Sequence, residues 1–176
     1  EAAESMILKL AGFLRYSLDR QPTALANLSA ELEAQRKYLE IEQTRFDDKL
    51  KVRFEIEPGL ESAMLPSLIL QPVLENAIKY AVTPSVDGGS ITVMARRDGD
   101  VLRIAVEDDG PGLPGEEALP RRRGVGLANI RERLELIYGQ RAGLIARNRE
   151  PHGCRIELYL PLEEDRVRPT PAPALS

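Results

Sequence analysis

The first residues that could do chemistry form the segment Asp108-Asp109-Gly110-Pro111-Gly112, which directly follows an alternating run typical of a strand. A carboxylate held at a strand end can accept a hydrogen bond from an exocyclic amine, and the glycines let the backbone come close to a ligand. Asp, Gly and Pro are also the commonest turn residues, so an ordinary acidic turn would use the same types. The segment is therefore a candidate binding loop with a structural alternative.

A second candidate is the glycine-rich segment Gly124-Val125-Gly126-Leu127, which follows three arginines at 121–123 and leads into a predicted helix. Backbone N–H groups at the start of a helix attract anions, and arginines add charge-assisted hydrogen bonds to phosphate. The spacing matches neither the Rossmann nor the Walker motif, and a tight turn into a helix needs the same glycines. The segment predicts either an anion site or a turn.

A third candidate consists of three polar residues, Glu75, Asn76 and Lys79, within a strongly apolar predicted helix. Glu75 and Lys79 are four residues apart, so they are neighbours on one helix face, where an exposed ion pair is the structural interpretation. The amide oxygen of Asn76 can instead serve as a ligand for Mg²⁺, which keeps waters and substrate phosphates as its other ligands.

The charge of the chain is uneven. The 24 Lys and Arg against 28 Asp and Glu give a net charge of −4, whereas residues 121–155 hold nine Arg and three Glu, a local excess of 9 − 3 = +6. An Arg-rich segment in an acidic protein favours a local anion site and no nucleic-acid partner, because nucleic-acid-binding proteins are usually basic overall. A solvated Arg-rich helix face is the alternative.

Several classes of protein are excluded by composition. The single cysteine, Cys154, cannot form an internal disulfide, and with the single histidine, His152, it cannot supply a Cys/His zinc site. No apolar run approaches the roughly 20 residues of a membrane span, and no signal peptide opens the chain. The first residue is Glu1 rather than Met, so we expect a piece of a longer protein.

The hydrophobic periods predict the elements that position these residues. Helical spacing indicates helices over about residues 7–21, 29–47, 67–81 and 126–138. Alternation indicates a strand over 51–56, a hairpin of 91–97 and 101–107, and strands near 143–148 and 154–160. This order predicts an α+β fold in which helices cover one face of an antiparallel or mixed sheet.

The predicted second helix carries Leu32, Leu39 and Phe46 at a seven-residue spacing. Such spacing is typical of a helix that packs on a partner helix. With no partner present, we expect this surface to self-associate or to bind the flank of its own domain.

Four segments in this order resemble the catalytic ATP-binding domain of bacterial sensor histidine kinases, whose fold is shared with gyrase-type ATPases: Leu-Glu-Asn-Ala-Ile-Lys-Tyr at 74–80, Asp-Asp-Gly-Pro-Gly at 108–112, Gly-Val-Gly-Leu-Ala-Asn at 124–129 and His-Gly-Cys-Arg-Ile at 152–156. Residues 70–72, Arg15-Tyr16, 38–42 and Arg45-Phe46 resemble the LytS-type subgroup. The resemblance implies a Bergerat-type two-layer sandwich over 49–162. Residues 1–48 would be the remnant of a dimerisation and phosphotransfer hairpin, and 163–176 a disordered tail.

The resemblance implies ATP and Mg²⁺ as cofactors. Asn76 would bind the Mg²⁺ that bridges the nucleotide phosphates, with Lys79 and Tyr80 near the phosphates or the adenine. Glu75 would orient or deprotonate an incoming histidine. These roles come from the match to residues 74–80.

The other segments imply the rest of the site. Asp108 would accept a hydrogen bond from the adenine amino group, and Gly110 and Gly112 would form the adjacent turn. Residues 113–123 would be a mobile lid, and the residues at its hinge and on the following helix would face the phosphates: Gly124, Val125, Gly126, Leu127, Asn129 and Arg131.

The implied function is transfer of the ATP γ-phosphate to a histidine that this chain lacks. Family members phosphorylate a histidine on the first hairpin helix, whereas His152 falls in the last matched segment, so we expect no self-phosphorylation. Implied partners are the upstream acceptor helix, a response regulator and a second copy in a homodimer. The full-length protein would be membrane-anchored with this part in the cytoplasm.

Two other functions remain open from the sequence. A non-catalytic nucleotide-sensing and dimerisation module would bind ATP without transferring phosphate. A gyrase-like ATPase would turn ATP over, but hydrolysing relatives carry a carboxylate one turn before the Mg²⁺-binding Asn, where this chain has Pro72. Proline has no group that accepts a proton, so efficient hydrolysis is not expected.

Overall fold

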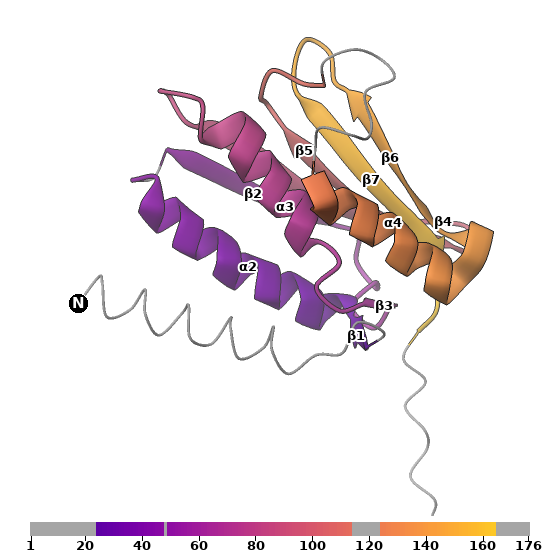
Figure 1. Cartoon of the computed structure of the whole chain (residues 1–176). Helices are drawn as coiled ribbons and strands as arrows, with labels where there is room; N and C mark the ends of the chain where they lie inside the picture. The colour runs from indigo at the N-terminus through magenta and orange to yellow at the C-terminus, as the bar shows by residue number, and fades with distance from the viewer. Residues whose placement is uncertain (1–23, 48, 114–123, 165–176) are drawn as a thin grey trace, which may run out of the picture.

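The computed structural model describes residues 24–47, 49–113 and 124–164. Its main feature is a five-stranded sheet with the order β2-β4-β5-β7-β6, in which only the pair β2 and β4 is parallel (Figure 1). The strands are β2 (Leu50–Ile56), β4 (Gly89–Asp98), β5 (Val101–Asp108), β6 (Gly143–Asn148) and β7 (Cys154–Pro161). The predicted hairpin and the two predicted final strands are confirmed.

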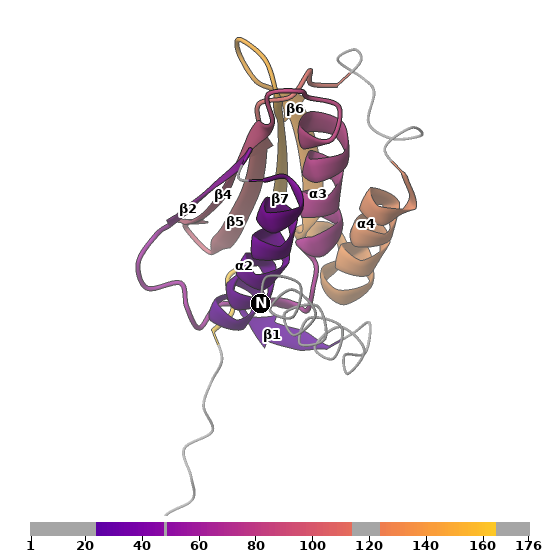
Figure 2. The ribbon, with the colours of Figure 1, turned by 90° about the vertical axis from the view of Figure 1, so that its left-hand side faces the viewer.

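Three helices lie on one face of this sheet: α2 (Leu28–Arg45), α3 (Gln71–Ala77) and α4 (Gly124–Tyr138) (Figure 2). A π-helical turn, η1 (Ile78–Val82), continues α3, and a 3-10 turn, η2 (Gly139–Arg141), follows α4. The mixed sheet with helices on one face confirms the predicted α+β class. The helix expected over 7–21 lies outside the described residues.

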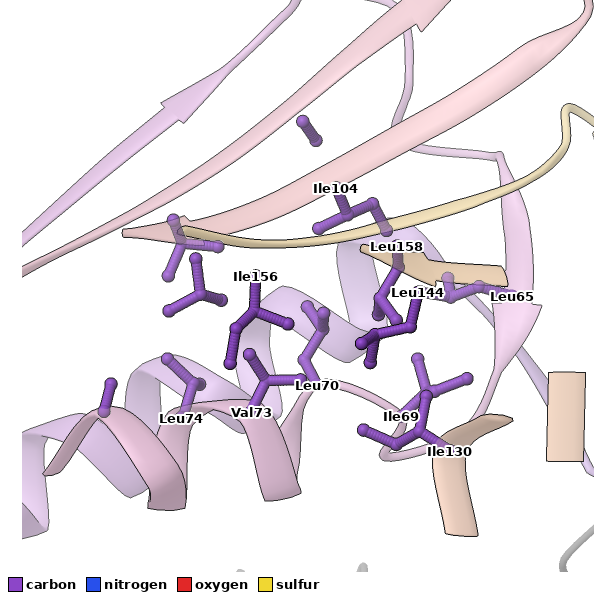
Figure 3. Packing of buried hydrophobic residues seen from close by; sticks show 14 of the residues in the cluster. Leu65, Ile69, Leu70, Val73, Leu74, Ile104, Ile130, Leu144, Ile156 and Leu158 are labelled. Atoms are coloured by element: carbon purple, nitrogen blue, oxygen red, sulfur yellow. The ribbon is translucent and has the colours of Figure 1, made fainter. Parts of the chain in front are cut away.

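The core lies between the sheet and α3. Leu70, Val73 and Leu74 face Ile156 and other apolar side chains of the central strands (Figure 3). The apolar residues of β5 and β7 alternate with charged ones, so one face of the sheet is buried and the other carries charge. Burial of each such side chain contributes about 1.5–3 kcal/mol, which fixes the sheet and α3 relative to each other.

A second, two-stranded sheet joins the start of α2 to the domain. Strand β1 (Leu25–Asn27) pairs antiparallel with β3 (Met64–Pro66). Asn27 then caps α2, since its side-chain oxygen accepts from Ala30 N at 2.8 Å. Neither strand is predicted from the sequence, because three residues are too few to show an alternating pattern.

Helix α2 packs on the domain itself. Leu32 and Leu39 are buried in the same core cluster as the sheet residues, and Phe46 packs against that cluster. Of the two expected uses of this seven-residue pattern, the described residues show contact with the domain's own flank. The segment 24–45 is therefore part of the folded unit.

The helix predicted over 67–81 begins later than expected. Residues 67–70 form a loop in which Leu68 has a φ of 57°, and α3 starts at Gln71 with Pro72 in its first turn. Proline is tolerated there because the first N–H groups of a helix have no partner within it. The helix ends in a π turn, in which Thr83 N donates to Ile78 O over 2.9 Å.

A disordered tail is expected over 163–176, and residues 165–176 of it lie outside the described residues. Glu163 and Glu164 themselves contact the domain, since Met64 N donates to Glu163 O at 2.7 Å and Glu164 forms a bridge with Ala63.

Candidate functional site

The carboxylate of Asp108 lies at the end of β5 and is only 5% exposed. Its Oδ1 accepts from Gly110 N at 3.0 Å and from Cys154 N at 3.2 Å. The backbone oxygen of Asp108 accepts from Arg149 Nη1 at 3.0 Å. A buried carboxylate requires hydrogen bonds, and here backbone N–H groups of two separate segments supply them. The side chain is thus held in one orientation at the end of the central strand β5.

Two glycines make this arrangement possible. A Cβ on Gly153 would lie 2.1 Å from Asp108 O, and Gly153 has a φ of 104°. A Cβ on Gly110 would lie 2.6 Å from the Cβ of Ala81 in the π turn. The expectation that Gly110 allows close backbone approach is therefore met by contacts within the protein, irrespective of any ligand.

Asn148 anchors the chain where the predicted lid begins. Its Oδ1 accepts from Leu113 N at 2.5 Å, and its Nδ2 donates to Leu113 O at 3.2 Å. Gly112 has a φ of 82°, and a Cβ there would lie 2.6 Å from Asn148 Oδ1. Leu113 is itself buried in the core. Asn148 is not predicted from the sequence, because nothing in its local pattern indicates a bond to a residue 35 positions away.

The second aspartate of the pair has a different role. Asp109 Oδ1 accepts from Ser90 N at 2.8 Å, which ties the loop to the start of β4. The exposed ring of His152 brings Nδ1 within 2.9 Å of the Asp109 carbonyl oxygen. His152 thus contacts the loop that follows β5.

Asn76, on α3, is 8% exposed, and its side chain makes no hydrogen bond to any residue that the structure describes. Glu75 is exposed and accepts from Gln71 Nε2 at 3.0 Å. Lys79 lies 5.2 Å from the centroid of the Tyr80 ring. The ion pair considered for Glu75 and Lys79 is therefore absent from this described helix, because each side chain contacts another residue.

An open cleft of about 360 Å³ borders the π turn and the Asp109 loop. Single π-helical turns often occur at functional sites, because they change the direction of side chains within a helix. The residues that line the cleft are Tyr80, Ala81, Pro84, Ser85, Gly88, Asp109, Gly110 and Pro111. The segments 74–80 and 108–112, separate in sequence, thus meet at one end of the sheet.

Helix α4 begins at Gly124, two residues earlier than expected. A Cβ on Gly126 would lie 3.0 Å from the Cβ of Pro72, so the start of α4 packs closely on α3. Leu127 is buried, whereas Asn129 and Arg131 are exposed. Of the predicted lid, Leu113 is described and 114–123 lie outside the described residues.

Most arginines of the segment 121–155 that the structure describes bind the protein itself. Arg149 and Arg155 form ion pairs with Glu107 at 3.2 and 2.7 Å. Arg133 Nη1 donates to Ser67 O at 2.6 Å. The net charge of +6 thus overstates the charge available to an anion, because Arg149 and Arg155 are paired with carboxylates within the fold. Arg131 remains a candidate on α4.

The site offers few metal ligands. Within 24–47, 49–113 and 124–164, no group of three or more His, Cys, Asp and Glu side chains could hold a metal ion. Mg²⁺ prefers oxygen ligands and keeps several waters, so the amide oxygen of Asn76 fits it only together with oxygens of a bound substrate. None of the helices in those ranges is long and apolar enough to cross a membrane.

Two family models match the chain. Residues 62–164 match the histidine kinase-, DNA gyrase B- and HSP90-like ATPases, and residues 1–50 match the model named histidine kinase. The first match covers more than half of the chain and contains the Asp108 loop, α3 and α4. The chain therefore belongs to the family of histidine kinase-, DNA gyrase B- and HSP90-like ATPases.

Sensor histidine kinases are among the relatives. The sensor histidine kinase YpdA of Escherichia coli is 33% identical over 174 residues, which are 95% of this chain and 30% of YpdA. The sensor protein LytS of Bacillus subtilis is 30% identical over 173 residues, which are 93% of this chain and 29% of LytS. The chain thus spans about 30% of the length of these relatives, and the resemblance to the LytS type is confirmed.

A solved structure shows the same fold. Histidine kinase ThkA, in complex with the response regulator protein TrrA, matches 92% of this chain and 48% of that chain, with a TM-score of 0.62 and 19% identity. At this identity the likeness shows that the two chains share a fold.

Proposed function

We propose that this chain binds ATP with Mg²⁺ and positions the γ-phosphate for transfer to a histidine on another segment or another chain. The observation that supports this most directly is the Asp108 carboxylate, which two backbone N–H groups hold at the end of β5, next to Gly110, which packs on Ala81 of the π turn. Such a fixed acceptor suits the amino group of adenine. Gly110 and Gly112 shape the turn beside it.

Asn76 is the proposed protein ligand for the metal. Its amide is nearly buried and has no hydrogen-bond partner among the described residues, so it is available to a ligand. When bound, Mg²⁺ would neutralise phosphate charge, which is the main requirement of phosphoryl transfer besides positioning. Lys79 and Tyr80, one turn further on, are proposed to lie near the phosphates or the adenine.

The start of α4 is the proposed phosphate-facing side. N–H groups in the first turn of a helix have no partner within it and point toward an anion. The residues proposed to act here are Gly124, Val125, Gly126, Leu127, Asn129 and Arg131. The close packing of Gly126 on Pro72 brings this helix start next to α3, which carries Asn76.

Glu75 is the proposed group that orients or deprotonates the incoming histidine. It is exposed on α3 and adjacent to Asn76 in sequence, so an approaching side chain can reach it. Pro72, in the first turn of the same helix, cannot activate water, so transfer to histidine is favoured over hydrolysis.

The partners follow from this activity. ThkA has been solved with a response regulator, and we propose that a response regulator receives the phosphate here too. The acceptor histidine would lie on the upstream helix of a dimerisation hairpin in a homodimer. The full-length protein would be anchored in the membrane with this domain in the cytoplasm.

Phosphate transfer in trans tests the proposal. The chain is mixed with Mg²⁺, ATP labelled on the γ-phosphate and the upstream helix that carries the acceptor histidine. We expect acid-labile label on the added helix, lost with Asn76→Ala and retained with Gln140→Ala, an exposed change in the turn after α4.

Other outcomes identify the alternatives. ATP binding without any labelled histidine would favour a nucleotide-sensing module. Steady phosphate release that Asn76→Ala abolishes would favour a gyrase-like ATPase. Label on the chain itself, without the added helix, would point to His152 as acceptor.

A further inference from the structure

Glu31, on the first turns of α2, is a buried carboxylate that the proposed chemistry does not use. Its side chain is fully buried, and it reaches a loop almost forty residues away. Oε2 accepts from Leu68 N at 2.7 Å, and Oε1 accepts from Leu70 N at 3.1 Å and from Gln35 Nε2 at 3.3 Å. A carboxylate on one helix thus holds the backbone that leads into another.

The loop needs this support. Leu68 has a φ of 57°, a left-handed conformation that a leucine rarely adopts. Leu70 is the N-cap residue of α3, and α3 has no side-chain cap of its own. Glu31 therefore supplies from α2 the acceptors that the loop and the start of α3 lack locally.

Arg133 of α4 holds the same loop through its carbonyl groups. Its Nη1 donates to Ser67 O at 2.6 Å, and Nη2 lies 3.5 Å from Ala24 O, the residue before β1. Burial raises the pKa of the Glu31 carboxyl, whereas the bonds from Leu70, Leu68 and Gln35 and the charge of Arg133 act against that rise. Two side chains of opposite charge type thus bind the backbone of one four-residue loop.

The loop leads directly to Asn76. Only Gln71 to Glu75 separate Leu70 from Asn76, within one helix, so a shift or rotation at Leu70 moves the Asn76 amide. Gly126, about two turns before Arg133 on α4, packs on Pro72. Helices α2, α3 and α4 are therefore joined through residues 67–70.

We infer that Glu31 and Arg133 are positioning residues, which couple the placement of α2 to the orientation of Asn76 in the nucleotide site. The inference rests on the proposed binding of Mg²⁺ and ATP. A displacement of α2, the helix matched by the histidine kinase model, would then alter metal-dependent phosphate binding. Asp108 lies on β5 and receives its bonds from other segments, so adenine binding would be unaffected.

The test compares ATP affinity with and without Mg²⁺, together with adenosine affinity, in the full-length protein. Glu31→Gln keeps the size of the side chain but directs an amino group at one of the backbone N–H donors. We expect the gain in ATP affinity from Mg²⁺ to fall by roughly fivefold or more, with adenosine affinity unchanged. Glu33→Gln is the matched control, since Glu33 is exposed on the same helix and pairs with the exposed Lys37.

Two further measurements keep the inference testable if Glu31→Gln folds poorly. Arg133→Lys retains the charge and should reduce the same Mg²⁺-dependent gain by a smaller factor. Hydrogen exchange at Leu68 and Leu70 should be faster in both variants than in the wild type, at unchanged exchange in β5.

An unchanged gain from Mg²⁺ in Glu31→Gln or Arg133→Lys would overturn the inference. Equal losses of adenosine and ATP affinity would also overturn it, because they indicate general destabilisation. A wild-type protein that binds no ATP at all would instead refute the proposed function on which the inference rests.

Discussion

Glu107 and Asp108 are consecutive carboxylates on β5, yet they serve opposite faces of the sheet. Asp108 points to the helix-covered side, where the N–H groups of Gly110 and Cys154 bind its Oδ1. Glu107 points to the outer face, where Arg149 and Arg155 pair with it. The difference follows from the period of two along a strand, which sends neighbours to opposite faces.

The two faces use their charges differently. On the outer face, carboxylates and guanidinium groups form an ion-pair network across β5 and β7. In this network Arg155 contacts Glu107 and Glu157, and Arg103 contacts Glu157. At the site, backbone donors orient a single carboxylate. We conclude that the ion-pair network contributes to the stability of the sheet, whereas Asp108, held by backbone donors, is the carboxylate suited to bind a ligand.

The largest effect should come from adding a methyl group beside Asp108. Gly153→Ala would place a Cβ 2.1 Å from Asp108 O at a φ of 104°, so the backbone must move. We expect the free energy of unfolding to fall by about 3 kcal/mol. Gly99→Ala is the control, since Gly99 has a φ of 59° but open space around it, and should cost about 1 kcal/mol. Chemical denaturation measures both, and equal losses would contradict the crowding at Asp108.

The exchange of a carboxylate for an amide separates the two faces by function. Asp108→Asn should weaken ATP binding by about 2 kcal/mol, roughly 30-fold, because an amide is a weaker acceptor and presents a donor to the same partners. Glu107→Gln should leave ATP affinity unchanged, since Glu107 points away from the site. Calorimetric titration gives both affinities. Unchanged affinity in Asp108→Asn would refute the adenine assignment.

Asn148, the last residue of β6, anchors the start of the predicted lid, and its substitution tests that anchor. Asn148→Ala removes both hydrogen bonds to Leu113, and we expect a loss of about 1 kcal/mol in unfolding free energy. Hydrogen exchange at Leu113 should be faster, and ATP affinity lower. Asn148→Asp keeps the acceptor and loses the donor, so its effect should lie between those of wild type and alanine. An alanine variant with unchanged exchange at Leu113 would contradict the anchor.

The smallest expected effect is on the pH dependence of stability, through the ion-pair network of the outer face. Burial opposes the charge of Glu157, but hydrogen bonds from Arg155 and Arg103 outweigh it and hold the pKa of this carboxyl below 4.5. A lowered pKa in the folded state stabilises the protein above the unfolded pKa, and that stability is lost as pH falls through the folded value. The free energy of unfolding, measured by denaturation at pH values from about 6 down to about 3, should fall less steeply for Glu157→Gln than for wild type. A steeper fall for Glu157→Gln would refute the stabilising role of the ion-pair network.

Much of the fold could be predicted from local patterns. Alternation located the hairpin of β4 and β5 and the final strands within one or two residues of their observed ends, because half-buried strands impose that period. The predicted start of α3 was wrong by four residues, since the apolar period continues through 67–70. There, contacts from Glu31 and Arg133 hold a loop that no local pattern indicates.

The sequence by itself determined the α+β class and the order of the longer elements, because periods and turn residues are local properties, and its four motifs determined the family by resemblance. Only the tertiary structure decided which charges act at the site. Arg133, Arg149 and Arg155 bind partners between 41 and 66 residues away, so these three guanidinium groups are engaged within the fold. Likewise, Asp108 receives its bond from Cys154 across 46 residues, a pairing that exists only once β5 and β7 are adjacent.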